Sequence, residues 1–312
     1  MNDPGAGQDA KSILMVFLHG LGDNVMFTGP LREYHKLHPS HRISLLILNN
    51  GSPEVWRNNP RIHEVFTSRS GRNPHYWDPA RYWRKDFWEL RREVRHVCEQ
   101  RHFDRIIHVS IAMMPELFYR LTRSYGPHKT WRIARDLGIP PKNLTPEIFL
   151  ELDQAGAEEF VRQNQLCQYA VLHPFSRYVR RGVGVESIQR IIEVLRGRGL
   201  QVVLAGRSRE IAALKLEHVI PAIDLPLNRL LAIIARAGIF LGTESGIAHL
   251  AGLVAKRMVV LSTRTKALRL TNCGPLAWGM PYSAVPVKVV EMSRPVSEIE
   301  MRLGNVLRTE VK

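Results

Sequence analysis

The stretch FLHGLGDN, residues 17–24, joins an apolar run to a segment in which apolar residues recur at helical spacing. The run SILMVFLH at 12–19 predicts a buried strand, and residues 24–37 predict the helix that follows it. Two further apolar runs, RISLLIL at 42–48 and IHEVFT at 62–67, predict additional strands. A helix that crosses between consecutive strands is typical of a parallel sheet, so this part of the chain predicts an α/β domain.

A second series of predicted strands and helices follows the proline-rich stretch GIPPKNLTP at 138–146. The predicted strands of this series lie at 169–173, 200–205, 239–242 and 258–262. The sequence therefore predicts an α/β protein with two doubly wound domains that face each other across a cleft and bind ligands at the carboxyl ends of their strands. We place the first domain at 1–155, the second at 156–295 and a terminal helix at 296–312, which can pack back on the first domain.

The composition is that of a globular protein with an anionic partner. The 312 residues are enough for two domains, and 45% of them are hydrophobic. The formal net charge of +15 indicates a nucleic acid, a nucleotide, a phosphorylated lipid or a membrane surface as partner, although a basic surface also serves solubility alone. We expect a cytoplasmic protein, because the N-terminus lacks the pattern of a secretory signal and no apolar run has the length of a membrane span.

Neither a disulfide framework nor a metal site is expected. The three cysteines lie far apart in the sequence and form no CxxC pair: Cys98, Cys167 and Cys273. The triplet His35, His38 and His41 has a spacing that could suit a metal ion. Pro39 breaks the predicted helix between these histidines, so we interpret them as surface residues and predict no metal.

Two familiar interpretations of FLHGLGDN fail in this sequence. An oxyanion loop of an α/β-hydrolase requires a G-x-S-x-G elbow elsewhere, and the nearest match, GTESG at 242–246, places its serine one position too late. A dinucleotide fingerprint requires a third glycine where this chain has Val25. It also requires an acid after the second strand, where Asn49 and Asn50 stand.

A third interpretation suits the stretch better. Gly20 and Gly22 permit a tight turn that exposes backbone N–H groups at the start of a helix. Asp23 then lies at or near the N-cap of that helix, where it could act as a base or serve only as a favourable cap. The sequence of this turn leaves both roles open.

The segment FLGTESGIAHLA at 240–251 has a related form in the second domain. A strand ends in a small polar turn and a helix begins at once, so hydroxyl and backbone N–H groups are available to a diphosphate. The alternative is an ordinary helix start that Ser245 caps.

Together with GLGDNVMFTGPLREYHKLHP at 20–39, this segment resembles the ADP-heptose:lipopolysaccharide heptosyltransferases, which form glycosyltransferase family nine and have the GT-B fold of two Rossmann-like domains. The matching positions of the first domain are Gly20, Gly22, Asp23, Thr28, His38 and Pro39, with Asn59 and Pro60 further on. The later motif is ESGIAHLA at 244–251, in which Glu244 stands where the family usually has Asp. The resemblance covers most of the chain and is weakest in 69–160 and 262–312.

The resemblance implies an inverting, metal-independent transfer of heptose or a related sugar from a nucleotide diphosphate donor such as ADP-heptose. It implies that Asp23 is the catalytic base, next to the glycine turn of Gly20 and Gly22. The donor-binding residues that it implies are Ser176, Arg180, Arg181, Glu244, Ser245, Gly246 and His249. Arg181 best matches the family's phosphate-binding lysine, and no cofactor or metal is expected.

The basic, aromatic-rich stretch 69–105 is the expected acceptor side of this enzyme. The residues that we single out there are Arg81, Trp83, Arg84 and Lys85. Arginines and aromatic rings would suit an anionic glycan or a lipid-linked acceptor such as lipopolysaccharide core. A peripheral association with the inner face of the membrane is a separate expectation for this cytoplasmic enzyme. The alternative is an amphipathic helix at 82–97 whose Trp and Phe side chains pack inward while its arginines are solvated.

Two rival functions stay open from the sequence. One is a basic nucleic-acid-binding protein, although the chain has no helix-turn-helix, zinc-finger or RRM signature, and we expect no nucleic acid. The other is a family member whose catalysis is altered by Glu244 in place of Asp.

Overall fold

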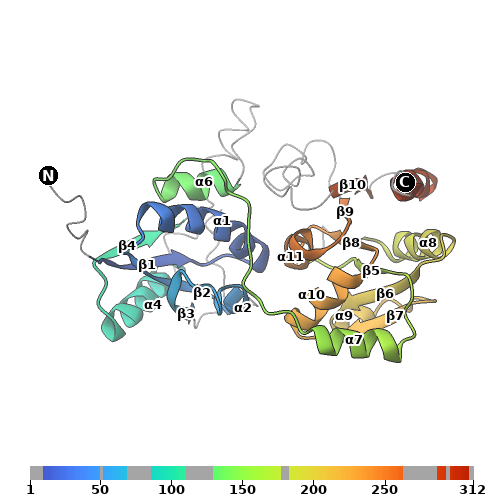
Figure 1. The fold of residues 1–312 in the computed structure, drawn as a ribbon, viewed down its shortest axis with the longest axis horizontal. Helices are drawn as coiled ribbons and strands as arrows, with labels where there is room; N and C mark the ends of the chain where they lie inside the picture. The colour runs from blue at the N-terminus through green and yellow to red at the C-terminus, as the bar shows by residue number, and fades with distance from the viewer. Residues whose placement is uncertain are drawn as a thin grey trace, which may run out of the picture. The chain divides into compact units, whose positions relative to one another are not determined.

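The computed structural model describes residues 10–49, 52–68, 86–109, 129–176, 183–262, 287–292 and 296–308. The chain divides into two compact units, Met1–Leu150 and Glu151–Lys312. Each unit holds a parallel sheet with helices on its faces (Figure 1).

The first unit has a four-stranded sheet of order β3-β2-β1-β4, in which every pair of neighbours is parallel. Its strands are β1 (Ser12–Phe17), β2 (Arg42–Leu48), β3 (Ile62–Ser68) and β4 (Arg105–His108). Its helices among the described residues are α1 (Leu21–Leu37), α2 (Ser52–Trp56), α4 (Asp86–Gln100) and α6 (Lys129–Asp136). The predicted strands at 12–19, 42–48 and 62–67 are therefore confirmed, whereas the short helix α2 was not predicted.

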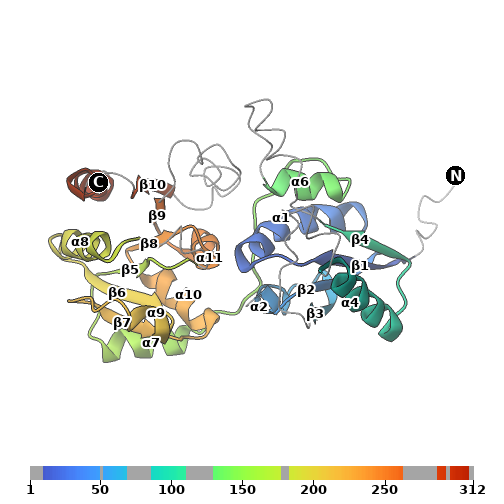
Figure 2. The ribbon, with the colours of Figure 1, turned by 180° about the vertical axis from the view of Figure 1, so that it is seen from behind.

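Strand β1 is buried on both faces because helices cover both sides of the sheet. Successive side chains of a strand point to opposite faces. Leu14 and Val16 belong to the same buried cluster as Leu90 and Val97 of α4. Phe17 on the other face packs against Phe27 of α1, with ring centroids 4.5 Å apart. Helices α1 and α4 thus lie on opposite sides of the sheet (Figure 2).

The second unit has a six-stranded parallel sheet of order β10-β9-β8-β5-β6-β7. Its strands are β5 (Tyr169–His173), β6 (Gln201–Gly206), β7 (Ile220–Ile223), β8 (Ile239–Thr243), β9 (Met258–Ser262) and β10 (Val287–Glu291). Its helices are α7 (Gln154–Gln163), α8 (Val185–Arg196), α9 (Ser208–Ile211), α10 (Leu227–Arg236), α11 (Gly246–Val254) and α12 (Val296–Arg308). Strands β7 and β10, at the two ends of this sheet, were not predicted.

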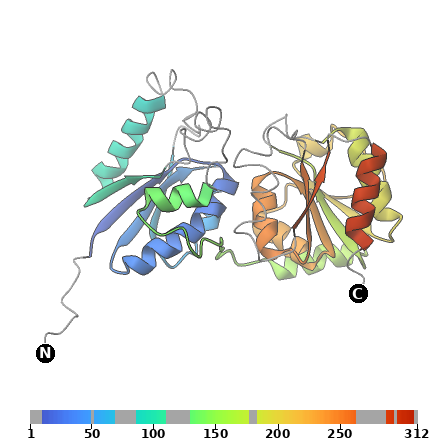
Figure 3. The same ribbon diagram turned by 90° about the horizontal axis from the view of Figure 1, so that it is seen from above.

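The C-terminal helix α12 belongs to the core of the second unit. Its buried side chains Ile299, Leu303 and Leu307 recur every four residues and join the cluster that includes Ile188 and Ile192 of α8. Figure 3 shows α12 and α8 on the same face of the sheet. The apolar stripe of α12 is thus buried against α8 and the sheet of its own unit.

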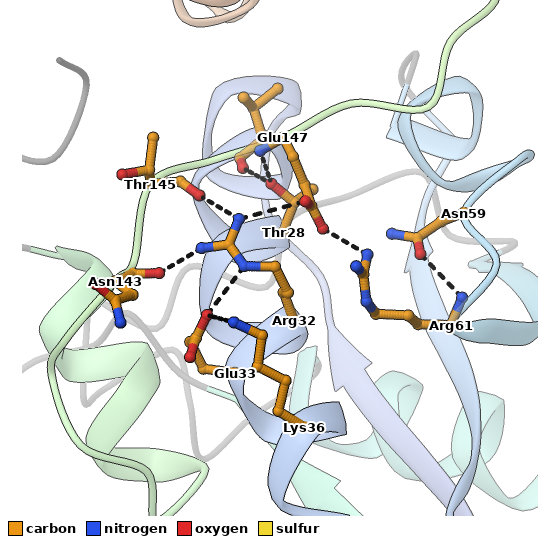
Figure 4. Close-up of polar contacts among 10 residues, drawn as sticks. Thr28, Arg32, Glu33, Lys36, Asn59, Arg61, Asn143, Thr145 and Glu147 are labelled. Atoms are coloured by element: carbon orange, nitrogen blue, oxygen red, sulfur yellow. Dashed lines mark hydrogen bonds and ion pairs between the residues drawn. The ribbon is translucent and has the colours of Figure 1, made fainter. Parts of the chain in front are cut away.

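A bridging carboxylate holds the segment at the end of the first unit onto that unit (Figure 4). One oxygen of Glu147 lies 3.3 Å from the guanidinium of Arg32 in α1, and the other lies 2.5 Å from that of Arg61. Arg32 also donates to the carbonyl oxygens of Asn143 and Thr145. Burial is the largest single influence on the pKa of the Arg32 guanidinium and acts to lower it. The hydrogen bonds and charges of Glu33 and Glu147 together outweigh burial, so this pKa is raised.

The same segment lies directly on the backbone of α1. The Glu147 N–H donates to the Thr28 hydroxyl at 2.9 Å, and that hydroxyl donates to the Val25 carbonyl at 2.7 Å. A Cβ atom placed on Gly29 would lie 2.3 Å from the Leu144 carbonyl oxygen. Gly29 therefore allows a close approach of two backbones that no other residue would permit.

On the other side of the unit boundary, Asp153 anchors the chain to the second unit. Its carboxylate lies 2.7 Å from the Arg229 guanidinium of α10 and accepts a hydrogen bond from the Gly156 N–H, which caps α7. The hydrogen bond from Arg229, followed by that from Gly156, holds the pKa of this carboxyl below its usual range. The connection between the units therefore runs between two fixed carboxylates, Glu147 and Asp153.

Candidate functional site

In the described part of each sheet the strand order reverses at one point. There the connections that leave the carboxyl ends of two neighbouring strands run to opposite sides of the sheet. In the first unit the chain passes from β1 through α1 to β2 on one side, while β4 pairs with β1 on the other. In the second unit β5 leads to β6 on one side, and the neighbouring β8 leads to β9 on the other. Ligands of open α/β sheets bind at such points, so the turns after β1, β5 and β8 are the candidate site elements.

The glycine turn after β1 starts helix α1 at this point of the first sheet. Gly20 is the N-cap, with extended backbone angles (φ −69°, ψ 169°), and the helix begins at Leu21. Asp23 is thus the third residue of the helix rather than its cap. A carboxylate there still interacts favourably with the positive end of the helix dipole, so a purely structural role for Asp23 stays open beside the predicted catalytic one.

The carboxylate of Asp23 folds back toward the cap. A Cβ atom built on Gly20 would lie 3.9 Å from Oδ2 of Asp23. The acid therefore lies above the turn between β1 and α1, at the carboxyl end of the central strand. This is the position that a base needs if an acceptor hydroxyl is to approach the reversal point of this sheet.

Asn24, which the sequence analysis did not single out, holds this turn in place. Its side chain is fully buried. Its Nδ2 donates to the carbonyl oxygens of His19 and Gly20, at 3.0 and 3.1 Å, and its Oδ1 accepts from the Trp56 indole at 2.9 Å. One amide thus links the end of β1, the start of α1 and helix α2. The sequence signal for this role was Asn24 itself, an Asn in the first turn of a helix that continues with apolar residues.

In the second unit, the turns after β5 and β8 are joined by side-chain hydrogen bonds. His173 at the end of β5 lies opposite Gly242 in the ladder. The Thr243 hydroxyl donates to the Phe175 carbonyl at 2.7 Å, and the Ser176 hydroxyl lies 3.3 Å from the Glu244 carbonyl oxygen that accepts from it. These bonds bring Ser176 and the ESG motif together, although they lie 68 positions apart in the sequence.

Helix α11 begins inside this pair of turns. Ser245 is its N-cap, and the serine hydroxyl accepts from the Ala248 N–H at 3.3 Å. The capping alternative for Ser245 is thus present, and it leaves the hydroxyl proton available for a ligand. The helix starts at Gly246, so its first-turn N–H groups and the positive end of its dipole face the reversal point. An anion is the ligand that such an arrangement favours.

Two further residues of the predicted donor site lie at the same place. Glu244 precedes the cap, and its side chain is 6% exposed. His249, four residues after the cap, is half-buried and donates its backbone N–H to the Ser245 carbonyl. The residue pairs i and i+4 share a face of a helix, so His249 lies on the side of α11 that Ser245 caps. Arg180 and Arg181 lie outside the described residues.

The histidine at the end of β5 is neutral. Burial lowers the pKa of His173 to about 4, against a smaller opposing effect of Glu210. The imidazole packs edge-on against Phe175, with centroids 5.8 Å apart. His173 therefore shapes the turn after β5 and contributes no positive charge at neutral pH.

The acceptor residues Arg81, Trp83, Arg84 and Lys85 lie outside the described residues, which resume at α4. There Trp88 is 54% exposed. The alternative of an amphipathic helix with solvated arginines is correct for Arg91, Arg92 and Arg95, which are exposed. Its expectation of inward-packed tryptophans is wrong for Trp88.

Two histidines of the triplet, His38 and His41, stack on each other just after the end of α1. The rings of His38 and His41 are parallel within 3°, with centroids 4.6 Å apart, and the His41 Nδ1 lies 3.1 Å from the Tyr34 hydroxyl. Burial, with the nearby charges of His38, Lys11 and Arg105, lowers the pKa of His41. Across the described ranges, no three His, Cys, Asp or Glu side chains gather closely enough to bind a metal ion.

The solved structures with similar folds include several glycosyltransferases. No family model matches the chain, and no curated protein matches it either. A glycosyl transferase of family 9 from Veillonella parvula DSM 2008 is 18% identical, with a TM-score of 0.65 over 97% of this chain and 91% of its own. The E. coli ADP-heptose lps heptosyltransferase II is 14% identical, with a TM-score of 0.64 over 96% of this chain and 100% of its own. E. coli heptosyltransferase WaaC with ADP-2-deoxy-2-fluoro heptose is 13% identical, with a TM-score of 0.60 over 95% of this chain and 99% of its own.

The chain has the GT-B fold of these glycosyltransferases. The predicted fold class, α/β with two doubly wound Rossmann-like domains, is confirmed. At identities of 12 to 18% the GT-B fold is what the comparison establishes, and activity has to be argued from the site residues. Among the described residues, no helix combines the length and the apolarity needed to cross a membrane.

Proposed function

We propose that the protein is an inverting glycosyltransferase that moves heptose or a related sugar from a nucleotide diphosphate donor, with ADP-heptose as the first candidate. The observation that carries the proposal is the pair of polar turns at the two strand reversals. One contains Gly20, Gly22 and Asp23, and the other combines Ser176 with the ESG motif at 244–246. Two E. coli heptosyltransferases match this chain with TM-scores of 0.64 and 0.60, above the 0.52 of a putative UDP-N-acetylglucosamine 2-epimerase from Listeria monocytogenes, which supports sugar transfer over epimerisation.

The second unit would bind the donor. A diphosphate leaving group carries negative charge, and the start of α11 supplies backbone N–H groups and a helix dipole to receive it. The hydroxyls of Ser176 and Ser245 lie beside that helix start. Arg180 and Arg181, which lie between Ser176 and α8 in the sequence, would add charge that neutral His173 does not provide.

The first unit would present the acceptor to Asp23. In an inverting transfer, the acceptor oxygen attacks the anomeric carbon from the face opposite the diphosphate. The new C–O bond forms as the bond to the diphosphate breaks, and the hydroxyl proton passes to the Asp23 carboxylate. The leaving diphosphate keeps the electron pair, and the N-terminus of α11 and the arginines stabilise its charge.

We propose that this transfer needs no metal ion, since the arginines and the helix start supply positive charge to the diphosphate. An anionic glycan or a lipid-linked acceptor, such as lipopolysaccharide core, is the acceptor class that the basic stretch 69–105 favours. The proposed location is the cytoplasm, at the inner face of the membrane.

A panel of nucleotides and nucleotide sugars tests the proposal. We expect ADP and ADP-heptose to raise the melting temperature of the wild-type protein, and EDTA to leave this shift unchanged. Asp23→Asn should retain the shift but lose about 100- to 10,000-fold in turnover, because a positioned base contributes that much. The absence of a shift with every nucleoside diphosphate would sink the proposal.

The two rivals predict different outcomes in the same assay. A catalytically altered relative would show the ADP shift without turnover, and Glu244→Asp would then restore activity. A nucleic-acid-binding protein would bind RNA or DNA with a steep dependence on salt and would show no nucleotide-sugar turnover.

A further inference from the structure

Helix α4 has one exposed face that carries an aromatic ring and three cations. Trp88, Arg91, Arg92 and Arg95 are all exposed. Their spacing of three and four residues puts them on the same face of the helix. On the opposite face, Leu90 and Val97 are buried against β1. Figure 3 shows α4, in teal, lying along the outside of the first unit's sheet.

Few acidic side chains of α4 are exposed beside these cations. Among the α4 residues whose exposure is described, Glu99 is the exposed acid, and it lies a turn beyond Arg95. Within the described part of the chain, neither Arg92 nor Arg95 forms an ion pair. The Arg91 guanidinium lies over the Trp88 ring, 5.5 Å from its centroid, which orders the tryptophan on the surface.

An exposed ring of this size is unusual where a core face is available. Trp88 is 54% exposed, whereas Trp56 of the same unit is almost completely buried. The apolar face of α4 is already buried in the protein core, so a membrane would meet the outer face, which offers three arginines and one tryptophan. Indole rings favour the boundary between headgroups and acyl chains, and each cation near an anionic leaflet adds attraction.

We propose that this face of α4, defined by Trp88, Arg91, Arg92 and Arg95, docks the protein on an anionic lipid bilayer. The face follows a straight helix over about 10 Å, which suits a plane of headgroups. The arginines pair with lipid phosphates, and Trp88 enters the headgroup boundary. The inference goes beyond the proposed transfer reaction and does not depend on it.

The test is sedimentation of the full-length protein with sucrose-loaded vesicles. The vesicles contain either phosphatidylcholine alone or phosphatidylcholine with 30 mol% phosphatidylglycerol as a chosen anionic fraction, at about 0.1 M salt, where exposed charges are not fully screened. We expect binding to the anionic vesicles only. Arg92→Glu with Arg95→Glu should weaken the apparent affinity at least about 30-fold, and Trp88→Ala several-fold.

Matched variants away from this face serve as controls. Trp131→Ala removes another exposed tryptophan of the first unit, which lies on α6. Arg209→Glu with Lys215→Glu reverses two exposed charges of the second unit. Both controls should bind anionic vesicles within about twofold of wild type, since they keep the α4 face. An unchanged melting temperature of all variants without ligand verifies folding and keeps this test separate from that of the proposed function.

Several results would overturn the inference. They are equal binding to neutral and anionic vesicles, full binding by the α4 charge variant, or an equal loss in the matched controls. Tighter binding of single-stranded RNA than of vesicles, lost in the same α4 variant, would assign the face to a nucleic acid instead.

Discussion

The indole of Trp56 donates a hydrogen bond to the side-chain oxygen of Asn24, at 2.9 Å. Both side chains are buried, and the Asn24 amide donates in turn to the carbonyl oxygens of His19 and Gly20. Through this chain of hydrogen bonds, helix α2 determines the shape of the turn that carries Asp23. The turn that carries the candidate base is thus held by two buried side chains.

Breaking this network should cost both stability and turnover. Trp56→Phe removes one donor and leaves the Asn24 oxygen unsatisfied, so we expect a loss of about 1–3 kcal/mol in the free energy of unfolding. Asn24→Ala should cost more, because three partners lose their bond. Urea unfolding measures the loss. Below the melting temperature both variants should retain the ADP shift while turnover falls, and unchanged turnover would show that the turn does not depend on this network.

Gly29 and Gly252 give a matched pair of helical glycines. A methyl group at Gly29 would meet the Leu144 carbonyl oxygen at 2.3 Å, whereas at Gly252 it would lie 3.7 Å from the Met258 sulfur. We expect Gly29→Ala to destabilise the protein by about 1–3 kcal/mol through overpacking. Gly252→Ala should be neutral or stabilising by up to about 1 kcal/mol, because Ala favours the helix. Thermal and urea unfolding compare the two, and equal effects would contradict the close approach at Gly29.

Glu147 bridges two arginines, and its removal leaves both without their shared partner. All three side chains are less than a quarter exposed, so the pairs are partly screened by solvent. We expect Glu147→Gln to lower the free energy of unfolding by about 1 kcal/mol and Glu147→Ala by about 1–3 kcal/mol. The effect should be smaller at 1 M salt. Glu159→Gln, on an exposed pair with Arg162, is the control and should change stability by less than about 0.5 kcal/mol.

The buried His173 makes stability depend on pH in a defined window. Its pKa in the folded protein is about 4, below the ordinary value of 6.5. Between these values the unfolded chain binds a proton that the folded protein does not, so stability decreases as the pH falls from 6.5 to 4. The full effect is about 3 kcal/mol. His173→Gln should reduce this dependence, with a smaller part left from histidines such as His41 and His108 whose pKa is also lowered. The exposed His102→Gln should keep it, as followed by urea unfolding at each pH.

Two substitutions of Ser245 separate capping from ligand binding. Ser245→Ala should cost about 1 kcal/mol of stability, whereas Ser245→Gly should cost only a few tenths, because glycine is tolerated at the N-cap. If the hydroxyl binds the donor diphosphate, both variants should weaken ADP binding to the same extent. Calorimetric titration with ADP measures this, and affinity restored in Ser245→Gly would mean that the serine acts only as a cap.

The local pattern of the sequence was sufficient for most of the fold. Buried strands such as β1 and β5 are runs of apolar residues, and amphipathic helices such as α8 and α10 have apolar residues at helical spacing. The two strands at the ends of the second sheet escaped prediction for different reasons. Strand β10, VKVVE, carries Lys288 and Glu291 among its valines. Strand β7, IPAI, has four residues and contains Pro221, whose missing N–H is tolerated at a sheet edge because no further strand pairs there.

By itself, the sequence determined that two α/β domains follow each other and that polar turns with Gly20, Gly22 and Asp23, and with Ser245 and Gly246, end two of their strands. Those properties are local, since periodicity and glycine turns depend on neighbouring residues. Only the tertiary structure decided that Gly20 rather than Asp23 caps α1, that Ser176 meets Glu244 and that Trp56 holds Asn24. Each of these pairings depends on strand order and burial, which join positions far apart in the chain and leave no periodic signal in it.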